Sequence, residues 1–166
     1  MGFRDRGLDG PTFRMREKLM AVGDDFWIED DHGHRLFKVN GKAARLRETF
    51  ILEDANGVEL CKIQEKKLSV RDKMTIEHGS TTATVHKRLL GIRDHYVIDV
   101  EGGEDLKAHG NILDHEYEIE RDGDTVAKVS KKWFRVRDTY GVQLASGQDV
   151  ALILAITVCV DAMARG

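Results

Sequence analysis

An internal repeat of short paired segments limits the fold of this chain more than any other feature. Residues 62–72 align with residues 128–138, and the same shift places Asn56-Gly57 on Asp122-Gly123. A second, shorter shift places His32-Gly33 on Asn56-Gly57. A polar residue followed by glycine, between two apolar segments, is typical of a tight hairpin turn. Each unit therefore predicts two strands joined by such a turn, then a corner and a third strand.

Hydrophobicity within these units alternates with a period of two. Apolar residues occupy one face of each expected strand, and the opposite face is mostly basic. One buried face and one solvated face are typical of an antiparallel sheet. The spacing of turns between residues 12 and 145 predicts roughly twelve strands. The core-facing pairs are Phe37 and Val39, Cys61 and Ile63, Ala83 and Val85, and Ala127 and Val129.

The longest apolar segment covers residues 150–160 and is bracketed by Asp149 and Asp161. It is too short to cross about 30 Å of hydrocarbon as a helix. Because it is apolar on every side, it belongs inside the protein, and we expect a helix over residues 147–164. A closed barrel removes sheet edges, but a barrel of twelve strands is too wide for its own side chains to fill.

We therefore expect a mainly β protein: a closed antiparallel barrel of about twelve strands around a central hydrophobic C-terminal helix. The whole chain, residues 1–166, is predicted to form one such domain. The helix acts as the plug of the barrel. Its large aliphatic residues are Val150, Leu152, Ile153, Leu154, Ile156, Val158 and Val160.

Several short motifs resemble one known family when their order is taken together. They are Gly110-Asn111-Ile112, Tyr117-Glu118-Ile119, the run over residues 129–133, the run over residues 138–142, and the apolar segment that ends at Asp161. Over residues 14–164 the chain is similar to the LURP-one-related family of the tubby C-terminal-like superfamily, which also contains the phospholipid scramblases. The resemblance implies a twelve-stranded barrel around a hydrophobic C-terminal helix.

The resemblance implies less about function. Plant members of the family are linked to basal defence, tubby domains bind phosphoinositides, and scramblase relatives bind calcium. The phosphoinositide-binding residues of tubby do not map onto this sequence position by position, so no binding site is transferred.

Basic residues recur at matching outward positions of the repeats, and they form the first candidate site. We expect them to bind anionic phospholipid headgroups or a protein partner, since each Lys or Arg near an anionic membrane contributes about 1 kcal/mol. The alternative is that they are solvated strand faces paired with the many acidic residues. The residues are Lys38, Arg45, Arg47, Lys62, Lys67, Arg71, Lys128, Arg135 and Arg137.

Other classes of site have weaker support. We expect the repeated Arg-Asp pairs to place carboxylates near the rim of the barrel, where they cap turns or pair with basic groups. The alternative is that these carboxylates form a ring that binds calcium. His32 and His34 share a strand face, but Gly33 between them marks a turn. Two cysteines make neither a disulfide framework nor a zinc site of cysteines. We expect no metal and no cofactor.

The sequence also argues against several functions. It lacks a nucleophile elbow, a dinucleotide-binding loop and a phosphate-binding loop, so we expect no enzyme. A net charge of -3 argues against nucleic acid as a partner. No signal peptide or transmembrane segment is visible, which predicts a cytoplasmic protein, peripheral at the membrane if the basic residues bind lipid. The alternative function is an intracellular carrier of a small apolar ligand held in the barrel.

Overall fold

The structure, a computed structural model, describes residues 8–16, 25–44, 47–65, 73–90, 93–134 and 137–165. Within these ranges the side chains of residues 42–44, 47–48, 89–90, 93–94 and 165 are not described. Twelve strands and one helix make up the described part of the chain. The strands are β1 (Thr12–Arg16), β2 (Asp25–Asp30), β3 (Arg35–Ala44), β4 (Arg47–Asp54), β5 (Glu59–Glu65), β6 (Lys73–His78), β7 (Thr81–Leu90), β8 (Arg93–Val100), β9 (Leu106–Asn111), β10 (Glu116–Arg121), β11 (Asp124–Ser130) and β12 (Thr139–Leu144).

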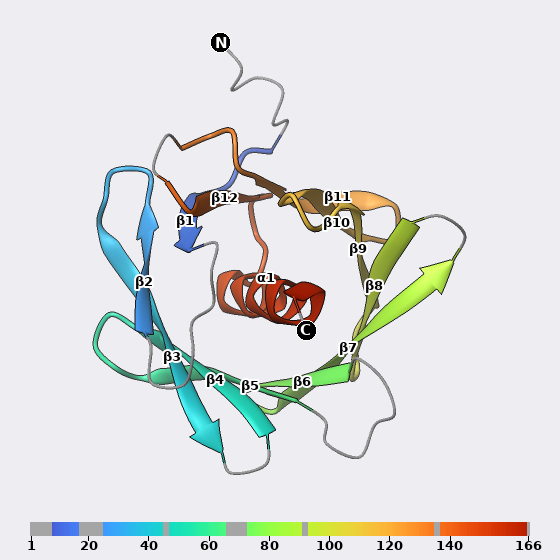
Figure 1. Cartoon of the computed structure of the whole chain (residues 1–166), viewed down its shortest axis with the longest axis horizontal. Coiled ribbons are helices and arrows are strands. Elements are labelled where there is room, and N and C mark those ends of the chain that lie inside the picture. The colour runs from blue at the N-terminus through green and yellow to red at the C-terminus, as the bar shows by residue number, and fades with distance from the viewer. Residues whose placement is uncertain are drawn as a thin grey trace.

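The strands form a closed antiparallel barrel (Figure 1). Each strand pairs with its neighbour in the chain, and β1 closes the ring by pairing with β12, from Thr12 opposite Gln143 to Arg16 opposite Thr139. The alternating burial along β5, where Cys61 and Ile63 point inward, is repeated in most strands. The predicted fold, a closed antiparallel barrel of about twelve strands, is confirmed.

Two of the predicted turns are equivalent in detail. In both, the first residue is an aspartate, Asp30 or Asp54, whose side-chain Oδ1 accepts hydrogen bonds from the backbone two and four residues later. Both turns end in a glycine with positive φ, 86° at Gly33 and 85° at Gly57. The shorter repeat shift therefore relates two turns of the same geometry.

The turn at Asp122-Gly123 is different. Both residues have positive φ, 51° and 85°, as a two-residue type I′ turn requires. Asn56 does not share this conformation, because only Gly57 has positive φ in its turn. The sequence alignment of these two turns therefore predicts the positions of both, but the two turns differ in backbone conformation at Asn56 and Asp122.

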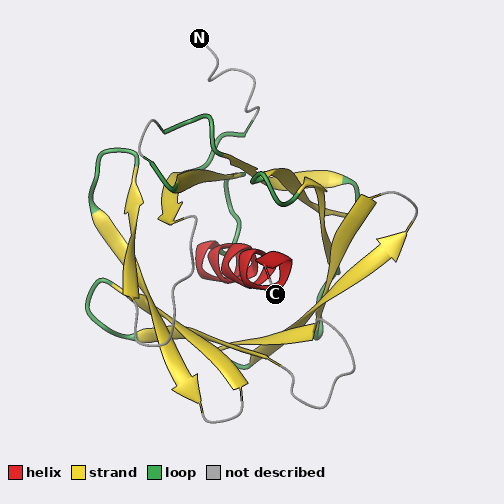
Figure 2. Cartoon of the chain, in the orientation of Figure 1, coloured by secondary structure: helices red, strands yellow, loops and turns green. Residues whose placement is uncertain are grey.

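The helix α1 (Val150–Arg165) runs through the interior of the barrel (Figures 1 and 2). It begins at Val150 rather than at the predicted Gly147, for two physical reasons. Gly147 has a φ of 80°, which lies outside the helical region. Asp149 is the N-cap, since its Oδ1 accepts a hydrogen bond of 3.2 Å from the backbone N–H of Leu152. Its other oxygen, Oδ2, lies 3.0 Å from Nε2 of His78, which ties the helix start to β6.

The plug residues of α1 lie in one apolar core with the inward faces of the strands. Val150 is half-buried, and the side chains of Leu152, Ile153, Leu154, Ile156, Val158 and Val160 are buried. The helix packs against β5, β6, β7 and β12. Strand residues with no exposed surface, such as Ile28, Ile63, Ile98 and Ile119, complete this core.

We predict that Ile153→Asp prevents folding, as does truncation after Gly147. The substitution loses about 1.5–3 kcal/mol of apolar burial and adds a carboxylate without a partner at the centre of the barrel. Leu113→Asp, at a side chain that is 70% exposed, is the matched control and leaves the protein folded. Thermal unfolding followed by circular dichroism distinguishes them. A cooperative transition in the truncated protein would show that α1 is dispensable.

We predict that Gly57→Val and Gly123→Val each destabilise the fold by more than about 1 kcal/mol, because valine disfavours positive φ. No atom lies within 4 Å of a Cβ placed at either glycine, so the cost comes from the backbone alone. Asn56→Val, with its φ in the ordinary region, is the control and costs less. Equilibrium unfolding in urea measures all three. Equal costs at Asn56 and Gly57 would contradict the turn geometry.

Candidate functional site

The predicted basic residues that the structure describes lie in two parts of the barrel rather than on one face. Lys62 lies on β5 and Lys128 on β11, which are six strands apart in either direction around the closed barrel. Each has a carboxylate opposite it on a neighbouring strand, Glu77 for Lys62 and Glu118 for Lys128. For these two lysines the arrangement matches the alternative interpretation, in which basic residues are paired with acidic residues on solvated faces.

The other described members of the predicted set lie on or beside strands that are within two strands of those of Lys62 and Lys128. Lys38 lies on β3, the backbone of Arg47 lies at the start of β4, and Arg137 is exposed shortly before β12. Four predicted residues lie outside the described part of the chain: Arg45, Lys67, Arg71 and Arg135.

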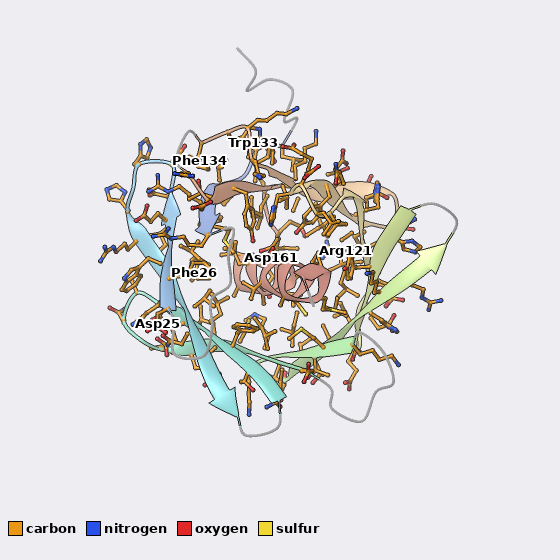
Figure 3. The ribbon with its side chains drawn as sticks, in the orientation of Figure 1. Asp25, Phe26, Arg121, Trp133, Phe134 and Asp161 are labelled. Atoms are coloured by element: carbon orange, nitrogen blue, oxygen red, sulfur yellow. The ribbon has the colours of Figure 1, made fainter. Side chains whose placement is uncertain are left out.

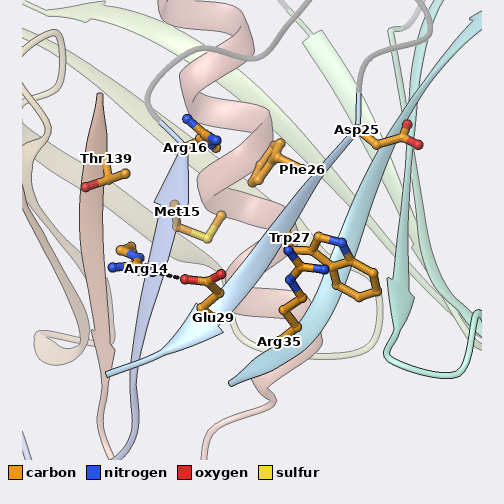
Figure 4. A pocket seen from close by; sticks show the side chains of 9 residues that line it. All are labelled: Arg14, Met15, Arg16, Asp25, Phe26, Trp27, Glu29, Arg35 and Thr139. Atoms are coloured by element: carbon orange, nitrogen blue, oxygen red, sulfur yellow. Dashed lines mark hydrogen bonds and ion pairs between the residues drawn. The ribbon is translucent and has the colours of Figure 1, made fainter. Parts of the chain in front are cut away.

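A pocket of about 230 Å³ opens where β1 and β2 separate (Figure 4). These strands share only two residue pairs, Phe13 with Asp30 and Arg14 with Glu29. Beyond them β1 continues to pair with β12, and β2 with β3. We call this place the seam pocket. Its lining residues are Arg14, Met15, Arg16, Asp25, Phe26, Trp27, Glu29, Arg35 and Thr139.

The seam pocket carries more positive than negative charge. Its two acidic residues each have a basic partner: Glu29 forms an ion pair with Arg14, and Asp25 lies 3.5 Å from Nζ of Lys38. Arg16 and Arg35 are exposed at the pocket. Among the described residues, neither is within ion-pairing distance of a carboxylate. Two guanidinium groups thus remain to bind an anion.

Aromatic rings lie beside two arginines of the pocket, Arg35 and Arg14. The guanidinium of Arg35 lies 5.4 Å from the ring centroid of Trp27, and Nζ of Lys38 lies 5.6 Å from the same ring. On the other side, Arg14 lies 5.7 Å from the ring of Phe134. Tryptophan next to basic side chains is an arrangement favoured where a protein meets the headgroup region of a membrane.

Phe134 and its neighbour Trp133 are held close to β12 by Gly141. A Cβ atom at this glycine would lie 2.6 Å from the Trp133 ring and 2.9 Å from the Phe134 ring. Any larger residue would push both rings away from the strand. Because Gly141 has no side chain, both rings can pack against this strand, beside β1 (Figure 3).

A second cluster of polar groups lies inside the barrel, near the C-terminal end of α1. Nε2 of His115 lies 2.8 Å from Oδ1 of Asp161, and the two side chains are 6% and 3% exposed. The His115 ring stacks on Tyr140, with 4.3 Å between the ring centroids. Burial, followed by the charge of Asp161, raises the pKa of Tyr117 well above its usual value. The burial of this His–Asp pair keeps substrates in solution away from it.

The cysteines and histidines offer little chemistry. Cys61 and Cys159 are free and buried. Burial raises the pKa of Cys61 to about 12 and raises that of Cys159 as well, so both thiols stay protonated and unreactive. Nδ1 of His34 lies 2.9 Å from Oδ2 of Asp30 at the exposed turn. Within the described residues, no three His, Cys, Asp or Glu side chains are grouped to hold a metal ion.

Sequence reasoning missed the residues of the seam pocket. The sequence did contain a signal. Arg14, Met15 and Arg16 alternate as in a strand, with two arginines on one face and one apolar residue on the other. Nothing in the sequence indicated that β1 and β2 would separate after two residue pairs. Arg16 of β1 and Arg35 of β3 line the same pocket because of that separation.

We predict that His115 and Asp161 stabilise the barrel as a unit. Asp161→Leu leaves a buried imidazole without its carboxylate and costs about 1–3 kcal/mol. His115→Leu combined with Asp161→Leu costs less than the sum of the two single changes, because neither polar group is then left behind. Urea unfolding of the four proteins measures the coupling. Additive costs would show that the pair contributes no interaction of its own.

Among the described residues, no helix is both long enough and apolar enough to cross a membrane.

Comparison with known proteins identifies the family. No curated protein matches the chain. A solved structure of a protein from Arabidopsis thaliana is similar, with a TM-score of 0.68 over 95% of this chain and 94% of the plant chain. The two are 19% identical, so this likeness shows the fold alone. The family model described as LURP-one-related matches residues 11–161. The chain therefore belongs to the LURP-one-related family.

Proposed function

We propose that this protein is a non-enzymatic binding module that associates peripherally with anionic phospholipid surfaces through the seam pocket. The observation that supports this function is the pair of exposed guanidinium groups of Arg16 and Arg35 at one pocket, with no carboxylate partner among the described residues. Guanidinium groups are well suited to phosphate, because their planar N–H groups can donate to two oxygens at once. Trp27 adds a ring suited to the headgroup region.

Because the protein as a whole is negatively charged, its binding to an anionic surface depends on a local cluster of basic residues. The chain carries a net charge of -3, so an anionic surface repels it on average. Each basic residue that faces the surface contributes about 1 kcal/mol of attraction. Arg16 and Arg35 together support weak binding that is sensitive to salt, which suits a module that binds reversibly from the cytoplasm.

Two other functions have less support. An enzyme needs an accessible reactive group, whereas the His115–Asp161 pair and both thiols are buried. A carrier that holds its ligand along the barrel axis competes with α1, whose aliphatic side chains lie there in the apolar core. A protein partner at the seam pocket is a possible outcome of the experiment below rather than part of this proposal.

We predict that the protein co-sediments with vesicles containing phosphatidylserine at low salt. Binding should fall steeply as salt rises to physiological strength, because exposed charges are then screened. Arg16→Gln with Arg35→Gln should abolish sedimentation. Lys62→Gln with Lys128→Gln removes the same charge from two distant strands and should leave binding close to that of the wild type.

Thermal unfolding of both double variants controls for stability, which exposed charges change little. Equal loss of binding in both variants would mean that total charge, not the seam pocket, drives association. Absence of wild-type binding at low salt would remove the phospholipid function and leave a protein partner at this surface.

A further inference from the structure

Two of the three asparagines in this chain are followed directly by glycine, in the pairs Asn40-Gly41 and Asn56-Gly57. In such a pair the backbone nitrogen of the glycine can attack the side-chain amide carbon of the asparagine, because glycine has no side chain to hinder the approach. The two pairs are equivalent in sequence, so only their structural surroundings can distinguish their reactivity.

The pair Asn56-Gly57 lies in the exposed turn between β4 and β5. The side chain of Asn56 is exposed, and no described atom lies within 4 Å of a Cβ placed at Gly57. One backbone hydrogen bond of 3.1 Å, to the carbonyl oxygen of Asp54, holds the Gly57 nitrogen. Because the hydrogen bonds of an exposed turn open in local fluctuations, this nitrogen becomes available without unfolding of the barrel.

The pair Asn40-Gly41 lies within β3, where the sheet holds the backbone on both sides. Asn40 is opposite Asp25 of β2 and Ile51 of β4, and Gly41 is opposite Phe50 of β4. Attack on the amide carbon requires rotation about the bond between the Cα and the carbonyl carbon of the asparagine, away from the extended conformation of a strand. That rotation separates β3 from its neighbours, so the reaction has to wait for the barrel to open.

The third asparagine is protected in a different way. Nδ2 of Asn111 donates a hydrogen bond of 2.8 Å to Oδ2 of Asp114, and Oδ1 of Asn111 accepts one of 3.3 Å from the backbone N–H of Asp114. The next residue is Ile112, whose β-branched side chain hinders the approach of its own nitrogen. Of the three asparagines, Asn56 is therefore the one that combines an exposed side chain with a following glycine outside the sheet.

We propose that Asn56 is a site of spontaneous deamidation in the folded protein and reacts far faster than Asn40. The Gly57 nitrogen forms a bond to Cγ of Asn56 and loses its proton, the bond from Cγ to Nδ2 breaks, and ammonia leaves. Water then opens the resulting cyclic imide at either carbonyl carbon, which gives aspartate or isoaspartate at position 56. The reaction needs water alone, and it involves no residue of the seam pocket.

The modification changes the turn in which it occurs. Oδ1 of Asp54 accepts hydrogen bonds of 2.8 and 2.9 Å from the backbone N–H groups of Asn56 and Val58. An isoaspartyl linkage adds one atom to the backbone between these two groups, so a single oxygen can no longer accept from both with this geometry. Either product also adds a negative charge to a turn that already carries Asp54. Deamidation therefore weakens the β4–β5 hairpin.

Peptide mapping by mass spectrometry measures all three asparagines in one sample of the full chain. After incubation of the folded protein at physiological temperature and pH, we expect Asn56 to have reacted roughly tenfold faster than Asn40, or more, because only the turn opens locally. Asn111 should stay intact. In concentrated urea, where the strands are no longer paired, the two Asn-Gly pairs should react at rates within about twofold of each other.

Asn56→His is the matched variant, because His32-Gly33 occupies the equivalent turn, with a φ of 86° at its glycine against 85° at Gly57. This variant should fold like the wild type and abolish the reaction at position 56, with an unchanged rate at Asn40. Wild-type protein that has been incubated should unfold at a lower urea concentration than fresh protein, whereas the incubated variant should not.

Two results would overturn the proposal. One is an Asn56 that stays intact in the folded protein, and the other is a reaction at Asn40 that is as fast as the reaction at Asn56. Conversion of Asn56 to isoaspartate without any loss of stability would overturn the effect assigned to the turn.

Discussion

Burial of the α1 side chains is the interaction on which the closed barrel depends. A ring of twelve strands encloses more space than its inward side chains fill, and empty apolar volume is costly. The helix supplies the missing atoms, with Ile153, Ile156 and Val160 buried among strand residues such as Ile28 and Ile63. Asp149 and His78 hold its start, and His115 and Asp161 hold its end. Between these two polar anchors the contact is mostly apolar.

Much of this architecture could be predicted from sequence because it depends on local patterns. Alternation predicted the faces of the strands, and the pairs that end in glycine predicted the turns, since a residue such as Gly57 must supply positive φ. The continuous apolar sequence of residues 150–160 predicted that this segment would be buried. The type of each turn was less accessible, because Asn56 and Asp122 look equivalent in sequence but adopt different backbones.

The candidate site could not be predicted in the same way. Matching positions in repeated units suggested that the basic residues would gather, but closure of the ring carries equivalent units to opposite sides, as with Lys62 and Lys128. Arg16 and Arg35 line one pocket because two strands separate, and that separation is a property of the whole ring. A repeat therefore predicts the local structure of one strand. It predicts less well which side chains lie next to the outward residues of that strand.

Pairing of β1 with β12 also has a consequence for how the protein is made. The strand that completes the ring and the helix that fills it both follow the first eleven strands in the chain. On the ribosome, those strands emerge without a closing partner and without the apolar side chains that would occupy their interior. Contacts so distant in sequence are slow to form, and unpaired strand edges invite association with other chains. Synthesis thus exposes the inner face of this barrel until its last elements arrive, which makes the nascent chain a natural client for chaperones.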